Sequence, residues 1–161
     1  MSGKAGRATA APATVATEGA IVENESFDLQ GRQRVSVTQE GNVPSGATKV
    51  DASSGNVANS AAAAALPAVA SVLNYLTGFE VTASGATAGL PVIVTAVGLL
   101  GGTLSWIFTF PAGVLVGAEP LVVKFDPPIP ASAANTAITV SCPAGGAGNT
   151  NACTTVHGYK I

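Results

Sequence analysis

Two cysteines and one histidine are the side chains whose types allow covalent or acid–base chemistry in this chain. Cys142 and Cys153 are separated by the ten residues PAGGAGNTNA, and His157 follows shortly after. If the segments that flank this loop pair as a hairpin, the two thiols come close enough for an intrachain disulfide. If both lie at the rim of the fold, they can instead form intermolecular disulfides with neighbouring subunits. Two reduced thiols, as in a protein kept in a reducing cytoplasm, are the third possibility.

The remaining inventory of catalytic groups is small. One histidine and two cysteines cannot supply the four ligands of a His/Cys zinc site within one chain. His157 lies in the strand-like pattern TTVHGY, which favours a histidine packed beside Tyr159 over a general base. The glycine-rich segment 145–148 lacks the lysine of a phosphate loop and is typical of a turn. The sequence therefore predicts a protein that is not an enzyme, with no catalytic residue, no metal site and no cofactor.

Charge is distributed unevenly along the chain. The formal net charge is −2, which gives no broad attraction to nucleic acid. Residues 1–51 hold 11 of the 16 charged side chains, and the following 110 residues hold five. A soluble monomer usually keeps roughly a quarter of its residues charged. We therefore expect much of the surface formed by residues 52–161 to be covered by other chains.

The uncharged stretch between Glu80 and Glu119 is long enough for a membrane span, but its pattern argues against one. It contains 38 residues. In the segment TLSWIFTF at 103–110, Leu, Trp, Phe and Phe alternate with Thr, Ser, Ile and Thr, which is the period of a half-buried strand. Glycines and Pro111 interrupt the run. The first 20 residues also lack the apolar core of a signal peptide, which disfavours secretion.

Alternation of apolar and polar residues, the period of a β-strand, also indicates the fold class. Short apolar segments alternate with loops rich in Gly, Pro, Ala and Asn, without an amphipathic helix between them. The sequence predicts an all-β protein, an antiparallel β-sandwich that is jelly-roll-like, with an extended N-terminal arm. Leu104, Trp106, Phe108 and Phe110 are expected at the centre of its core. The predicted strands are 72–83, 90–97, 103–110, 120–125, 136–142 and 152–160.

The N-terminal part differs in composition. The predicted organisation is a flexible arm at 1–20, an edge hairpin with an Ala-rich linker at 21–71, and the β-sandwich domain at 72–161. Within the second region, 51–71 has the composition for a helical turn or two before Pro67 but no large apolar stripe, which favours a linker. The arm, the edge segment 33–39 and the loop-proximal cysteines are expected to contact other subunits. The interface residues predicted outside the cysteines are Lys4, Arg7, Arg32, Arg34, Val35 and Val37.

A family resemblance covers roughly residues 72–161. The segments GLLGGTLSW, PPIPASAANTAI and GAGNTNA followed by VHGY resemble a recurring small β-protein encoded among the virion genes of tailed bacteriophages. The resemblance implies a structural virion protein, a capsid decoration, cement or linking subunit. The two cysteines are not part of the family's general pattern.

The expectations that follow are structural rather than catalytic. The resemblance implies the major capsid protein and other virion proteins as partners, self-association as a homotrimer, and location in a virion made in the host cytoplasm. Neither nucleic acid nor membrane is expected as a partner. A collar, tail or fibre-base protein of the same kind of virion is the main alternative. A carbohydrate-binding β-sandwich would need exposed aromatic residues, which are few, and a small hydrolase would depend on His157 alone.

Overall fold

A computed structural model describes residues 26–27, 33–34 and 43–161. The chain divides into two units, residues 1–38 and 39–161. In the first, β1 (Ser26–Phe27) pairs antiparallel with β2 (Gln33–Arg34), and Ser26 lies opposite Arg34. This pairing agrees with the hairpin predicted within 21–71.

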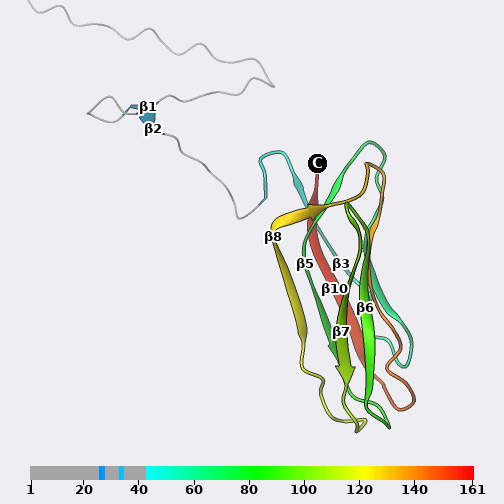
Figure 1. The fold of residues 1–161 in the computed structure, drawn as a ribbon. Helices are drawn as coiled ribbons and strands as arrows, with labels where there is room; N and C mark the ends of the chain where they lie inside the picture. The colour runs from blue at the N-terminus through cyan, green and yellow to red at the C-terminus, as the bar shows by residue number, and fades with distance from the viewer. Residues whose placement is uncertain (1–25, 28–32, 35–42) are drawn as a thin grey trace, which may run out of the picture. The chain divides into compact units, whose positions relative to one another are not determined.

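The second unit is an elongated stack of two antiparallel sheets of four strands each (Figure 1). Sheet I has the order β3-β10-β5-β8 and sheet II the order β4-β9-β6-β7. The described residues contain no helix, so the predicted all-β sandwich is confirmed. The strands of sheet I are β3 (Thr48–Ser53), β10 (Ala152–Lys160), β5 (Asn74–Ala83) and β8 (Leu121–Pro130). Those of sheet II are β4 (Ala62–Leu66), β9 (Ile138–Cys142), β6 (Leu90–Leu99) and β7 (Gly102–Phe110).

Alternation along each strand builds the core between the sheets. Successive side chains of a strand point to opposite faces, so every second residue is buried. In β9, Ile138, Val140 and Cys142 are buried and the residues between them are half-buried. The largest fully buried side chains are Phe79, Phe110, Leu66, Leu76 and Ile138.

The six predicted strands all occur, but the predicted linker is wrong. Residues 48–53 form the edge strand β3 of sheet I, and 62–66 form the edge strand β4 of sheet II. Ala62, Ala64 and Leu66 are buried, and the whole of β4 pairs with β9. The sandwich therefore begins at Thr48 rather than at residue 72. A run of alanines carries no hydrophobic period, so its burial is decided by the partner strand.

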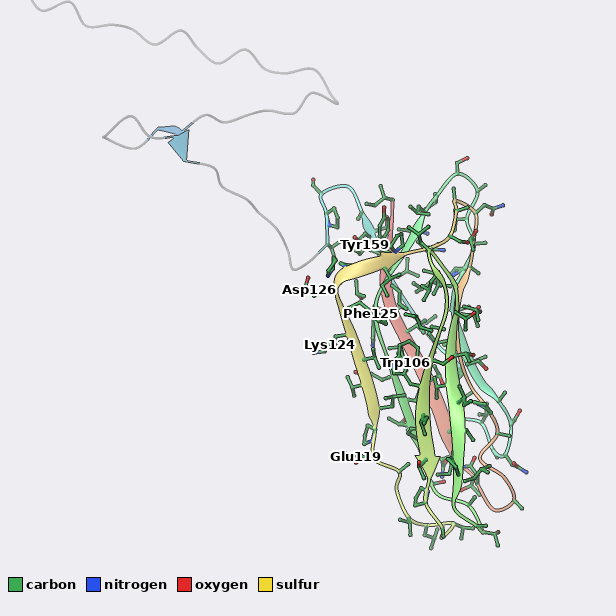
Figure 2. The ribbon with its side chains drawn as sticks, viewed as in Figure 1. Trp106, Glu119, Lys124, Phe125, Asp126 and Tyr159 are labelled. Carbon is green, nitrogen blue, oxygen red and sulfur yellow. The ribbon has the colours of Figure 1, made fainter. Side chains whose placement is uncertain are left out.

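The aromatic face of β7 lies in the core only at its C-terminal half. Phe108 and Phe110 are buried and meet edge to face, with ring centroids 5.2 Å apart. Trp106 is half-buried and packs on Phe79 at 4.8 Å and on Phe125 at 6.2 Å, between the sheets (Figure 2). The expectation for Leu104 is wrong, because its side chain is 37% exposed.

The long uncharged stretch is accounted for by strands. Its residues belong mainly to β6 and β7, which pair antiparallel. In the part of the chain that the structure describes, no helix is long and apolar enough to cross a membrane.

Candidate interaction surfaces

The two cysteines lie in different sheets and are both free. Cys142 ends β9 in sheet II, whereas Cys153 is the second residue of β10 in sheet I. The loop between them crosses from one sheet to the other, so the flanking strands do not pair as a hairpin, and of the three alternatives the structure has the two free thiols. Cys142 is buried in the core, and Cys153 alternates with the buried residues Ala152 and Thr154, which turns it outward. Of the two thiols, only Cys153 is placed for a bond to another chain.

The surroundings of the thiols differ accordingly. Burial raises the pKa of Cys142 to about 11, since the core disfavours a thiolate. Its Sγ lies 3.6 Å from the carbonyl oxygen of Pro143. The Sγ of Cys153 lies 3.3 Å from the hydroxyl of Ser53, on the neighbouring strand β3.

His157 lies on a strand, as predicted, and its imidazole contacts the carboxylate of Asp51. It lies opposite Asp51 in the pairing of β10 with β3, and its Nδ1 is 2.8 Å from the Oδ1 of Asp51. Its side chain is 42% exposed, so solvent screens the pair. Tyr159 stacks on Tyr75 instead, with ring centroids 4.8 Å apart. Among the described residues, no hydroxyl or thiol is hydrogen-bonded to the imidazole.

A shallow hollow of about 260 Å³ adjoins His157 on sheet I. It forms where Gly78 leaves a gap in the row between His157 on β10 and Lys124 on β8. An added Cβ at Gly78 would come within 2.6 Å of the carbonyl oxygen of Val123, so the close approach of β5 and β8 requires glycine. Thr77 and Glu80 complete its polar lining. The hollow is small and its charges are mixed, which favours a solvated surface over a ligand site.

The outer face of sheet II carries no charge. The four strands of this sheet contain no Asp, Glu, Lys, Arg or His at any position. Ile93 and Ile107 lie opposite each other on this face and are 59% and 76% exposed. The outward residues of its pairing rows are Ala63, Ala65, Pro91, Ile93, Thr95, Val97, Ser105, Ile107, Thr109, Thr139 and Ser141.

Sheet I, in contrast to sheet II, carries charged side chains. Each of its strands carries at least one charged side chain, and those of β8 point away from the sandwich (Figure 2). The acidic and basic residues of its strands are Lys49, Asp51, Glu80, Lys124, Asp126, His157 and Lys160. The sandwich formed by the described residues therefore has one charged and one neutral broad face.

An apolar tip, residues 114–116, projects from the loop between β7 and β8. Backbone hydrogen bonds fix this loop: the N–H of Gly85 donates to the carbonyl of Val116, and the N–H of Gly113 donates to that of Ala86. Leu115 at the apex is nevertheless 94% exposed. Val114 and Val116 beside it are 40% and 49% exposed, so the tip presents three adjacent apolar side chains, a candidate contact site.

The interface residues predicted from the sequence fall largely outside the described part of the chain. Lys4, Arg7, Arg32, Val35 and Val37 lie outside the described residues, and Arg34 is placed on β2 by its backbone pairing alone. The sequence analysis did not predict which residues form the neutral face and the apolar tip. The scarcity of charge after residue 51 was the feature of the sequence that pointed to such surfaces.

Comparison with family models, curated proteins and solved structures finds no match to this chain. The described residues also contain no group of three or more His, Cys, Asp or Glu side chains that could hold a metal ion.

Proposed function

We propose that this protein is a structural subunit of a tailed-bacteriophage virion, a decoration or cement protein that bridges neighbouring capsid subunits. The observation that carries the proposal is the contrast between its two outer faces. A neutral sheet face of Ala, Ser, Thr, Val and Ile can bury against another protein without desolvating charges. The charged face of sheet I would then remain in solvent.

Attachment in this role is mechanical. The neutral face packs on the major capsid protein or on other copies of this chain. The copies assemble as the homotrimer that the family resemblance implies. Leu115 at the apolar tip inserts into a pocket of a neighbour. Each contact can be weak, because a subunit held at several points dissociates only when all of them open together. Neither catalysis, nucleic acid nor a membrane enters this role, and the protein acts within the virion.

The low aromatic content of the surface supports this role over sugar binding. Trp106 packs between the sheets, Phe79, Phe108 and Phe110 are buried, and Tyr75 and Tyr159 are stacked on each other. A carbohydrate platform needs exposed aromatic rings. The described surface offers aliphatic side chains in their place.

The test uses purified virions of a phage that encodes this chain. Peptide mapping by mass spectrometry identifies the protein in the particle, and cryo-electron microscopy locates it. We expect regular copies on the capsid that contact the major capsid protein through the neutral face or the apolar tip. Density at a collar, tail or fibre base instead would support the alternative virion position. Absence from the particle would falsify the virion role.

A second experiment tests the contact made by the apolar tip. Recombinant wild-type protein and a Leu115→Asp variant are added to particles from which the protein has been stripped, and bound copies are quantified. Because Leu115 is almost fully exposed, the variant is expected to fold normally and to bind at least tenfold more weakly. Val122→Asp, a change at an exposed position on the charged face, is the matched control and should bind as the wild type does. Equal binding of L115D and wild type would contradict a role for the tip.

A further inference from the structure

Three of the four sheet edges are protected against pairing with another strand. The edge strand β8 contains Lys124, Asp126 and three prolines, and its register with β5 breaks between Lys124 and Ile129. The edge strand β3 carries Lys49 and Asp51. The edge strand β4 is only five residues long and is followed by Pro67. Charges, prolines, irregular register and short length are the usual means by which sheet edges avoid association.

The fourth edge, β7, has none of these features. It is nine residues long, contains no charged residue and no proline, and pairs with β6 without a register shift from Leu104 to Phe110. β6 is its only partner in sheet II. Among the described residues, no isolated bridge and no loop hydrogen bond involves the backbone of residues 103–110, so this edge has no further strand partner there. Its outward backbone N–H and C=O groups form a template that an extended strand can complete.

We propose that β7 pairs antiparallel with β7 of a second copy of this chain about a two-fold axis, joining the two sheets II into one eight-stranded sheet. The register that overlaps all nine residues places Trp106 at the axis and Ser105 opposite Ile107 of the second copy. This inference concerns an edge and does not depend on the virion role.

The absence of charge on β7 favours a second copy of this chain as the strand that pairs with its edge. About a two-fold axis each edge meets itself, so a charged strand would place like charges close together. β7 and its neighbour β6 contain no charge. In the proposed register, the row of Ile93 and Ile107 continues into Ser105 and Thr95 of the second copy, which are also uncharged. An acidic or basic partner peptide would find no complementary charge on this strand.

A charge beside β7 is compatible with the same register. Glu119 lines a groove with Ile107, Phe108 and Thr109, at the C-terminal half of β7. With Trp106 at the axis, Thr109 and its equivalent in the second copy lie six residues apart along the pair, roughly 20 Å. That distance exceeds the Debye length of about 8 Å at physiological ionic strength, so the two Glu119 carboxylates do not repel strongly.

The first experiment measures the assembly mass of the full-length protein by light scattering. Ile107→Lys places a charge on the exposed side of the edge, and we expect it to halve the mass, from dimer to monomer or from hexamer to trimer. Ile93→Lys, in the same row on the interior strand β6, is the matched control and should retain the mass. If I93K dissociates the assembly as strongly as I107K, the contact is face to face and edge pairing is overturned. An unchanged mass for I107K also overturns it.

A cross-linking experiment tests the register in a Cys153→Ser background. Chains carrying Ser105→Cys and chains carrying Ile107→Cys are mixed and oxidised. A disulfide between the two kinds of chain is expected, because these positions face each other across the axis. A disulfide within S105C alone or I107C alone would contradict the register, and no cross-link in any sample would contradict the pairing.

Hydrogen exchange separates a second copy from a segment of the same chain. We expect the amides of 103–109 to be protected at high protein concentration and to lose that protection on dilution, while β6 stays protected. Protection of β7 that does not change with concentration would mean that the chain covers its own edge, which overturns the proposal.

Discussion

At the scale of single residues, position on a strand decides chemistry. Cys142 and Cys153 flank one loop, yet the first points into the core and the second points outward from the other sheet. His157 gains a partner from β3, since Asp51 is brought opposite it although the two are far apart in sequence. Neither the separation of the two cysteines nor the contact of His157 with Asp51 could be predicted from the sequence, because both depend on which strands share a sheet.

The buried thiol predicts a dependence of stability on alkaline pH. In the unfolded chain the Cys142 thiol ionises near its ordinary pKa of 9.0, whereas in the fold its pKa is raised to about 11. The unfolded state therefore loses the proton first, and the free energy of unfolding should fall as pH rises from 9 toward 11, by at most about 2 kcal/mol. Burial also raises the pKa of Tyr159, which acts in the same direction.

The measurement is urea unfolding between pH 8 and pH 11. Cys142→Ala should show a shallower decline than the wild type, whereas Cys153→Ala, which removes the outward thiol, should follow the wild type. Parallel curves for C142A and wild type would show that ionisation of Cys142 does not contribute.

At the scale of elements, hydrophobic period and turn residues were sufficient to predict six strands of the sandwich but not β3 and β4. The segment 103–110 alternates cleanly and ends at Pro111, so both its type and its bounds could be predicted. Strand β4 is almost all alanine, and a residue with one methyl group gives little contrast between buried and exposed positions. Its place in the sandwich comes from pairing with β9, which is tertiary information.

The strand assignment of the alanine run can be tested by charge insertion. Ala64 is buried and faces the core, whereas Ala63 is exposed on the outer face. Ala64→Asp should lower the free energy of unfolding by more than about 3 kcal/mol, since it buries an unpaired carboxylate. Ala63→Asp should change it by less than about 1 kcal/mol. Chemical denaturation of both variants is the measurement, and equal tolerance would indicate a linker.

At the scale of the whole molecule, charge is segregated between two faces. The charged residues of 43–161 lie on sheet I or, as Glu119, just before β8, whereas sheet II has none. The sequence revealed the scarcity of charge but not its segregation, because sheet membership is not sequential. Strands β4, β6, β7 and β9 come together only in the folded chain.

Segregation predicts how assembly responds to salt. The contacts proposed for the neutral face and for the β7 edge involve no ion pairs, so raising the salt concentration to about 1 M should not weaken the proposed self-association and should strengthen it slightly. Sedimentation velocity across a salt series is the measurement. Dissociation at high salt would show that charged residues hold the assembly together.

The order of the strands also constrains when the subunit can form during translation. β10 is synthesised after every other described strand, yet it lies between β3 and β5, and β9 lies between β4 and β6 in the same way. The early strands β3 and β4 therefore have no partners on the ribosome until the segment 138–160 has emerged. A ribosome that stalls before this point releases a chain without either complete sheet. The neutral outer face of sheet II therefore forms only after the segment 138–142 has been synthesised, late in the chain.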